Sequence, residues 1–151
     1  QYVRKIADFD NYRKRMIKEK QDAFDYANTN LLSDLLESLD NFDRALDAAK
    51  NATDVETVVQ GVQMTKDKLV SMLENKYNLV GYGQQGDIFD PNVHEAIASV
   101  QAPVVEAICS EVYLKGYKLK ERVIRHAKVM VQMPDGSVQS EEVNSSTEVE
   151  S

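Results

Sequence analysis

The distribution of proline and glycine constrains this chain more than any other feature of its sequence. All three prolines, Pro91, Pro103 and Pro134, come after residue 90, and Gly61 is the only glycine before residue 81. Proline and glycine are the main breakers of helices. Because the first 78 residues almost lack them, we expect this region to be helical, with one interruption near residues 51–54.

The first predicted helix runs from Tyr2 to Lys50 and would be about 75 Å long at the rise of an α-helix. Arg13 and Lys20 interrupt the front of its apolar stripe, so we expect the front to pack weakly. The rear half carries apolar residues at heptad spacing, a pattern that requires a partner helix. We therefore predict a homodimer that pairs through the rear stripe. Its residues are Leu31, Leu35, Leu39, Phe42, Leu46 and Ala49.

A second helix is predicted to begin at a capping box, with Thr53 as the cap and Glu56 three residues later. It ends near Tyr77, and apolar residues at helical spacing line one of its faces. Two consecutive helices make a hairpin, and two hairpins from two chains would make a dimeric four-helix bundle. The apolar face consists of Val55, Val59, Val62, Leu69 and Leu73.

Beyond Val80 the composition changes, because glycine, proline and β-branched residues occur together. Such a composition is typical of short strands joined by turns. We predict a turn at Met133–Gly136, where proline and glycine flank an aspartate. The predicted strands are Ile97–Val100, Val104–Leu114 and Arg122–Gln132.

These elements predict an α+β protein with three parts. Residues 1–80 would form the long paired helices, and residues 81–137 a small β-rich domain. Residues 138–151 hold four Glu, no basic residue and little apolar content, so they are predicted to be a disordered acidic tail.

The net charge of −7 argues against a general nucleic-acid binder. The basic residues are nevertheless concentrated: residues 13–20 hold five against one Glu, and residues 115–128 hold six against one Glu. Solvated faces of a helix and a strand would explain these two islands, and docking patches for an acidic partner protein are the functional interpretation. No run of 18 apolar residues is present, so we expect no membrane-spanning helix.

Candidate chemistry is sparse. The segment Gly81–Gly86 matches GxGxxG, but a helix is expected before it and none after it, which favours a simple loop. His94 and His126 are the only histidines and have no metal-ligand spacing; His94 is expected in a turn-to-helix segment, making a local hydrogen bond. The single cysteine, Cys109, is predicted to be a small core residue. We expect no catalytic site, no cofactor and no direct nucleotide binding.

The Asp90-Pro91 pair predicts a stiff turn, because proline fixes its own φ and disfavours helix at the preceding residue. This turn would present Phe89 at a fixed angle. A lone phenylalanine most often packs inward, and that is the simpler interpretation of Phe89.

Four sequence blocks carry a family resemblance. They are NYRKR at Asn11–Arg15, LDNFDRALD at Leu39–Asp47, FDPNVHEAI at Phe89–Ile97 and GYKLKERVIRHAKVMV at Gly116–Val131. Together they resemble the GrpE family, the nucleotide exchange factors of DnaK-type heat-shock chaperones, over residues 8–136.

The resemblance implies a homodimer that binds the ATPase domain of a DnaK-type chaperone and promotes ADP release, which assists protein folding and the heat-shock response. In GrpE proteins the apolar residue and the proline of the Asp-Pro motif face the chaperone, so the resemblance favours an outward Phe89. If residues 122 and 131 belonged to one unbroken strand, they would point to opposite faces, so contact with one partner would require a bend, a bulge or a strand edge. The implied chaperone-binding residues are Phe89, Pro91, Arg122, Val131, Arg13, Arg44 and Asp47.

Two other classes of protein fit part of the sequence. A coiled-coil scaffold or adaptor with a β-rich head would share every helical feature but would need neither Pro91 nor Arg122. A nucleotide-binding enzyme rests on the glycine loop alone. The expected location is the bacterial cytoplasm, with an organelle matrix as the alternative, because a first residue of Gln suggests a truncated N-terminus.

Overall fold

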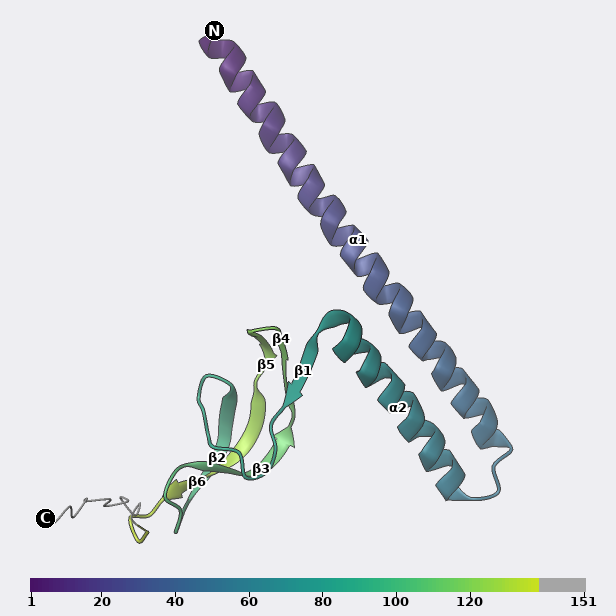
Figure 1. Ribbon diagram of the computed structural model, residues 1–151, viewed down its shortest axis with the longest axis vertical. Helices are drawn as coiled ribbons and strands as arrows, with labels where there is room; N and C mark the ends of the chain where they lie inside the picture. The colour runs from purple at the N-terminus through teal and green to yellow at the C-terminus, as the bar shows by residue number, and fades with distance from the viewer. Residues whose placement is uncertain (139–151) are drawn as a thin grey trace, which may run out of the picture. The chain divides into compact units, whose positions relative to one another are not determined.

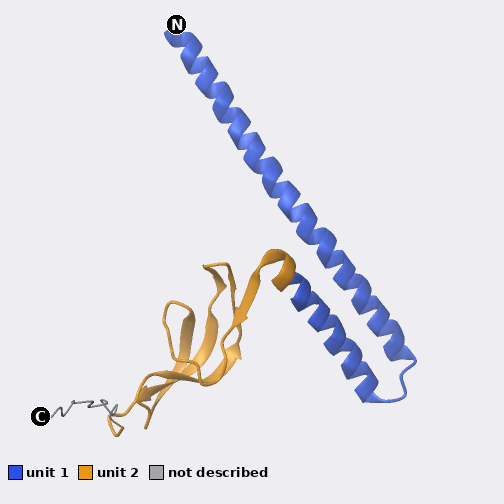
Figure 2. Cartoon of the chain, viewed as in Figure 1, with its two compact units in different colours: residues 1–73 blue, residues 74–151 orange. Residues whose placement is uncertain are grey.

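The structure is a computed structural model that describes residues 1–138. The chain divides into two compact units, residues 1–73 and residues 74–151 (Figure 2). Helix α1 (Tyr2–Lys50) and most of helix α2 (Val55–Tyr77) form the first unit. Both predicted helices and the α+β class are confirmed.

In the first unit, α1 and α2 run antiparallel as a hairpin (Figure 1). Small residues lie where the two helices approach each other. A Cβ atom on Gly61 of α2 would lie 4.0 Å from the Cβ of Ala45 on α1. Ser38 and Thr65 are 8% and 5% exposed, and the Thr65 hydroxyl donates to the Gly61 carbonyl at 2.9 Å. The side chains at the centre of the contact between α1 and α2 are therefore small, and two of them are polar.

The predicted dimerisation stripe of α1 is divided between two environments. Leu31, Leu35 and Ala49 are half-buried. Leu39, Phe42 and Leu46 remain 56%, 38% and 62% exposed. A heptad stripe drifts around a straight helix by about 20° per heptad. One stripe can therefore supply residues both to the face of α1 that meets α2 and to the face that is open to solvent.

Further large apolar side chains of the hairpin are open to solvent. Leu32 and Leu36 on α1 are 60% and 59% exposed. On α2, Val55, Val59 and Val62 are 77%, 59% and 51% exposed, so this half of the predicted apolar face is uncovered in the single chain. The hairpin alone does not bury the apolar surface that the sequence supplies.

The N-terminal cap of α2 differs from the prediction. The Thr57 backbone N–H donates to Asp54 Oδ1 at 3.1 Å, so Asp54 is the cap and the predicted Thr53 capping box is wrong. Hydrogen bonding by the Thr57 side chain, followed by this backbone hydrogen bond, stabilises the carboxylate and lowers the pKa of Asp54. Thr53 and Asp54 are both good capping residues, and only the one-residue register of the helix start distinguishes them.

Gly61→Ala should stabilise the hairpin. Gly61 lies inside α2, where alanine is favoured over glycine by about 1 kcal/mol. The new methyl group would meet Ala45 at ordinary van der Waals distance. We expect the melting temperature of the helices, followed by circular dichroism at 222 nm, to rise by several degrees. A fall would mean that the helices approach more closely here than the structure has them.

The second unit is built from two three-stranded sheets within the described residues. One sheet has the order β1-β4-β5 and is antiparallel throughout. The other has the order β2-β6-β3, in which β2 and β6 are parallel while β3 and β6 are antiparallel. The strands are β1 (Leu79–Tyr82), β2 (His94–Ala102), β3 (Ile108–Leu114), β4 (Gly116–Leu119), β5 (Arg122–Arg125) and β6 (Ala127–Pro134).

The predicted strands are partly right. The segment Ile97–Val100 lies within the longer β2, and the predicted strand Val104–Leu114 begins only at Ile108. The predicted strand Arg122–Gln132 is two strands, because the chain passes from one sheet to the other at His126. Strands β1 and β4 were not predicted, since four residues are too few to show an alternating pattern.

The core of the second unit consists of Cys109, Ala127, Val129 and Val131, each at most 1% exposed. The prediction that Cys109 is a core residue is confirmed. Burial, followed by the nearby Asp87 carboxylate, raises the pKa of the Cys109 thiol. The thiol is therefore an unreactive packing group.

Two predictions concern the margins of the second unit. The predicted acidic tail, residues 138–151, lies outside the described residues except for Val138, which is exposed. The division between residues 80 and 81 stays a prediction, and β1 begins two residues before it. In residues 1–138, neither helix has an apolar stretch that is long enough to cross a lipid bilayer.

Candidate functional site

The Asp-Pro motif forms a turn that Asp90 organises through its own backbone and side chain. The Asp90 carbonyl accepts from the N–H groups of Val93 and His94 at 3.1 and 2.8 Å. Its Oδ1 accepts from the Asn92 N–H at 2.9 Å. Pro91 lies exposed within the turn. The predicted stiff turn is confirmed, but His94 begins β2 rather than a helix.

Phe89 is half-buried and packs against the core. Its ring stacks on the ring of His94, with centroids 6.0 Å apart, and its N–H donates to the Ala107 carbonyl at 2.9 Å. The structure therefore combines the two interpretations of Phe89. One part of the side chain supports the turn, and the other part is open to solvent.

Within the second unit, called the β-rich module below, Tyr82 connects this turn to the end of strand β5. Its hydroxyl lies 2.7 Å from the Val93 carbonyl oxygen and 3.1 Å from the Arg125 carbonyl oxygen, as a donor facing two acceptors. Burial raises the pKa of the Tyr82 hydroxyl, which keeps the hydrogen in place at neutral pH. Gly116 makes room for the ring, because a Cβ atom there would overlap it. A residue at the end of β1 thus holds the turn beside the joint between β5 and β6.

The hairpin of β4 and β5 carries much of the second basic island. Arg122 is exposed at the start of β5. The Arg125 guanidinium lies 5.2 Å from the centre of the Tyr117 ring, and its Nε–H donates to the Lys115 carbonyl at 3.1 Å. The Lys118 ammonium lies 5.4 Å from the centre of the Tyr82 ring. Arg125 and Lys118 are therefore engaged with aromatic rings of their own sheet.

The structure does not support Val131 as a surface contact. Val131 is 1% exposed and lies in β6, the central strand of its sheet. The break at His126 removes the assumption of one continuous strand, so the parity argument does not apply. Burial decides the question instead, and we leave Val131 out of the proposed binding surface.

The three remaining predicted contact residues lie on α1. Arg13, Arg44 and Asp47 are all exposed. Asp47 Oδ1 lies 3.6 Å from Lys50 Nζ, and both side chains are 77% exposed, so this ion pair is weak. The three side chains are accessible to a partner.

Sequence reasoning missed the structural roles of Tyr82 and Gly116. In the sequence, Tyr82 stands out only as part of the glycine loop. Gly116 opens a strand, and a glycine in such a place can mark the close approach of another group. That signal could have found Gly116, but no pattern in the sequence identifies Tyr82 as the residue that it accommodates.

The glycine loop begins in strand β1 and not directly after the helix that was expected before it, but it lacks the helix that a dinucleotide site needs after the loop. Gly83 and Gly86 have φ angles of 97° and 94°, and the Gly86 N–H donates to the Cys109 carbonyl at 2.8 Å. Gly86 lies in a turn, and an extended segment follows it where a phosphate-binding loop would open a helix. The interpretation as a structural loop fits this geometry.

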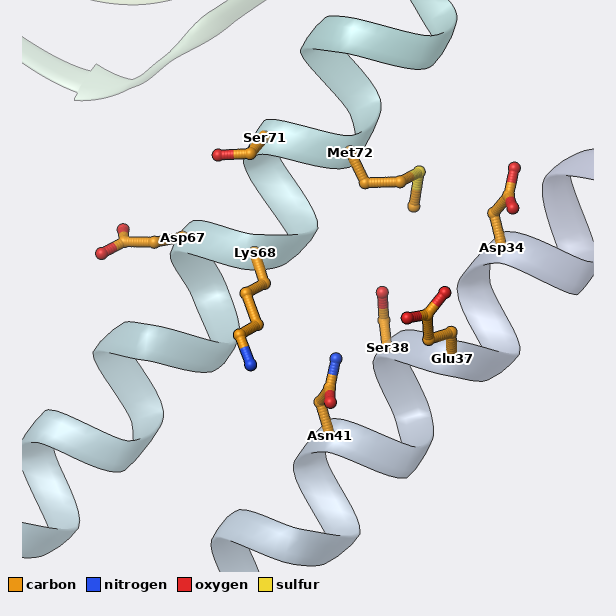
Figure 3. A pocket seen from close by; sticks show the side chains of 8 residues that line it. All are labelled: Asp34, Glu37, Ser38, Asn41, Asp67, Lys68, Ser71 and Met72. Carbon is orange, nitrogen blue, oxygen red and sulfur yellow. The ribbon is translucent and has the colours of Figure 1, made fainter.

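A cleft of about 350 Å³ lies between α1 and α2. Figure 3 shows that Ser38 and Asn41 point into the gap, whereas Asp67 and Ser71 point away from α1. Within residues 1–138, no group of three or more His, Cys, Asp or Glu side chains is placed to hold a metal ion. The cleft is lined by Asp34, Glu37, Ser38, Asn41, Asp67, Lys68, Ser71 and Met72.

Comparison with known proteins gives one family for the greater part of the chain. The GrpE family matches residues 1–133. Protein GrpE of Treponema denticola is 60% identical over 139 residues, which cover 89% of this chain and 56% of the relative. Protein GrpE of Treponema pallidum is 45% identical over 141 residues, which cover 89% of this chain and 64% of the relative.

A third relative, Protein GrpE of Borrelia hermsii, is 41% identical over 135 residues, covering 86% of this chain and 72% of the relative. The chain thus spans little more than half the length of the Treponema denticola protein. The match nevertheless includes both helices and nearly all of the β-rich module. By this match, the chain belongs to the GrpE family.

Proposed function

We propose that this protein is a co-chaperone that binds the ATPase domain of a DnaK-type chaperone and promotes release of ADP. Family membership is the observation that carries the proposal. The β-rich module adds support, because the Tyr82 hydroxyl is bonded both to the Asp-Pro turn and to the end of β5. The turn is thereby linked to the strand that begins at Arg122. The protein would act in the bacterial cytoplasm, the location expected from its bacterial relatives.

The proposed mechanism requires no covalent step. The protein would bind the open, nucleotide-poor conformer of the ATPase domain more tightly than the closed one. A ligand shifts a conformational equilibrium only through such a difference in affinity. ADP would then leave faster, ATP could enter, and the chaperone could release its substrate.

The proposed contact surface has two parts. In the β-rich module it comprises Phe89, Pro91 and Arg122, which belong to the turn and to the basic hairpin. On α1 it comprises Arg13, Arg44 and Asp47. Arginine and aromatic side chains are the usual anchors of protein interfaces.

The protein is further proposed to act as a homodimer in a four-helix bundle. The observation in favour is the row of exposed apolar side chains on the hairpin, including Leu39 and Leu46 on α1 and Val59 on α2. An isolated long helix is marginal in water without tertiary packing. An obligate interface of this kind usually buries about 2,000 Å² or more.

Leu39→Asp should weaken the dimer, because it places a charge in the proposed apolar interface. Sedimentation equilibrium at micromolar concentration would show a shift toward monomer. Ile88→Asp is the matched control, since Ile88 is 62% exposed in the β-rich module and lies outside the proposed interface. A wild-type protein that is monomeric with intact helicity would contradict the dimer.

Arg122→Ala should weaken chaperone binding by more than tenfold, since truncating an interface arginine often costs about 2 kcal/mol or more. The loss should appear mainly as faster dissociation. Lys128→Ala is the matched control, because it removes an exposed positive charge from the same module. If both variants slow association equally and leave dissociation unchanged, the basic island acts only by long-range attraction.

The decisive experiment measures the release of labelled ADP from a DnaK-type chaperone of the same organism. We expect the wild-type protein to accelerate release and Arg122→Ala to accelerate it less. A scaffold or adaptor would bind the chaperone and leave the rate of ADP release unchanged. That outcome would exclude the exchange function.

A further inference from the structure

We infer that neutral His94 is a positioning residue that holds the Asp-Pro turn in its binding conformation, and that its protonation releases the turn. The effect on chaperone binding rests on the proposed function. The effect on the turn concerns this protein alone and can be tested without a partner.

The protonation state follows from one hydrogen bond. The Asp90 backbone N–H donates to His94 Nδ1 at 3.0 Å. A backbone N–H can only donate, so Nδ1 must present a lone pair, and the proton of the neutral ring must lie on Nε2. Protonating Nδ1 would place two N–H groups against each other. This bond therefore exists only with the neutral ring.

The His94 ring also supports the side chain that precedes the turn. His94 is 6% exposed and stacks on Phe89, while Tyr82 meets it edge-on with centroids 6.1 Å apart. Two aromatic rings attract a cation, but neither can accept the Nδ1 proton that faces Asp90. Protonation thus costs the hydrogen bond whatever the rings contribute. The same ring governs the positions of both Phe89 and Asp90.

The other titratable groups around His94 do not replace this bond. The Tyr82 hydroxyl faces the Val93 and Arg125 carbonyls, and Asp90 Oδ1 accepts from Asn92. The Lys118 ammonium lies over the Tyr82 ring, and Glu95, the next residue of β2, is exposed.

His126 provides a contrast within the same module. Its Nε2 lies 3.1 Å from the Asn92 carbonyl oxygen, which can only accept, so Nε2 donates. Nε2 carries a hydrogen both in that neutral tautomer and in the cation. Protonating His126 therefore preserves its hydrogen bond to the turn, whereas protonating His94 removes one. The two histidines are the only ones in the chain.

The consequence is a pH-dependent turn. Imidazole side chains change charge between about pH 5 and 8. At the upper end of this range the bond from Asp90 to His94 is intact, and the turn keeps Pro91 and Phe89 in place. Where the ring is protonated the bond is lost, and chaperone affinity should then fall by about five- to tenfold, as expected for an unmade buried hydrogen bond.

The first test uses the free protein. Nitrogen-15 NMR of the imidazole rings between pH 8 and 5.5 reports the tautomer, and the Asp90 amide signal reports the turn. We expect His94 to carry its hydrogen on Nε2 at pH 8, and the Asp90 amide to shift together with the titration of the ring. A neutral ring protonated on Nδ1, or an Asp90 amide that ignores the titration, would overturn the inference.

The second test compares chaperone affinities over the same pH range for three variants. His94→Asn places Oδ1 near the position of Nδ1, so it keeps an acceptor that does not titrate in this range; its affinity should vary less with pH than that of the wild type. His94→Phe keeps a ring without an acceptor and should bind weakly at every pH. His126→Gln keeps a donor near Nε2 and should retain the wild-type pH profile.

Differences between variants cancel any titration of the chaperone itself. The same pH dependence in wild type and His94→Asn would overturn the inference even if both bind tightly. Absence of chaperone binding by the wild type at every pH would instead contradict the proposed function. In that case the NMR titration would still decide the role of His94.

Discussion

Saturating ATP should weaken the affinity of this protein for its proposed partner, a DnaK-type chaperone, by roughly 5- to 150-fold, the range given by a coupling of about 1–3 kcal/mol. An exchange factor that prefers the nucleotide-poor chaperone must lower the chaperone's affinity for nucleotide. Linkage then requires nucleotide to lower the chaperone's affinity for the exchange factor by the same factor. Exchange would end itself, because entry of ATP drives the protein off.

This coupling separates an exchange factor from a tether. The measurement is the dissociation constant with and without saturating ATP, for example by fluorescence anisotropy of the labelled protein. A nucleotide that the chaperone does not bind serves as the control for ionic strength and Mg²⁺. Equal dissociation constants with and without ATP would rule out the exchange mechanism even if binding were tight.

Gly116→Ala should destabilise the β-rich module by about 3 kcal/mol, the upper part of the usual cost of overpacking a core. A Cβ atom at residue 116 would lie 2.7 Å from the Tyr82 hydroxyl oxygen and closer still to the ring carbons. The ring cannot turn aside cheaply, because its hydroxyl is bonded between the Val93 and Arg125 carbonyls. For a domain of this size, the melting temperature should fall by more than 10 °C.

The double variant Gly116→Ala/Tyr82→Leu tests the cause. If the overlap with the ring is responsible, the double variant should be less destabilised than the sum of the two single variants. Hydrogen exchange of amides in β1 and β4 would follow the module directly. Loss of stability equal to that sum would place the cost of Gly116→Ala elsewhere. Retained helical signal at 222 nm would show that the damage is confined to the module.

The helices could be predicted closely because local chemistry determines them. The scarcity of glycine and proline allows α1 and α2, and Asn51 and Ala52 lie where they break. The cap at Asp54 could not be predicted to the residue, since Thr53 is an equally good candidate. Which large side chains of α1 remain uncovered depends on the face that α2 occupies, and a stripe of apolar residues does not specify that face.

The strands were harder to predict because their pairing is not local. The run from Arg122 to Gln132 reads as one β-branched segment, yet its halves pair with different strands and belong to different sheets. The resemblance places Val131 on the binding surface, whereas its burial follows from the central position of β6, which the sequence does not reveal. The Asp-Pro turn was predictable, because proline restricts the backbone wherever it occurs.

The central position of β6 also determines when this module can form during synthesis. Strands β2 and β3 pair with β6 and not with each other, and β6 is the last of the three in the chain. Neither strand can pair along its full length until its partner residues of β6 have left the ribosome, up to Pro134 for β2 and up to Gln132 for β3. Chains grow at about 5–20 residues per second, so the apolar side chains of β2 and β3 wait one to several seconds for their partner. The hairpin of α1 and α2, by contrast, contains only residues that are already synthesised, and helices form within microseconds.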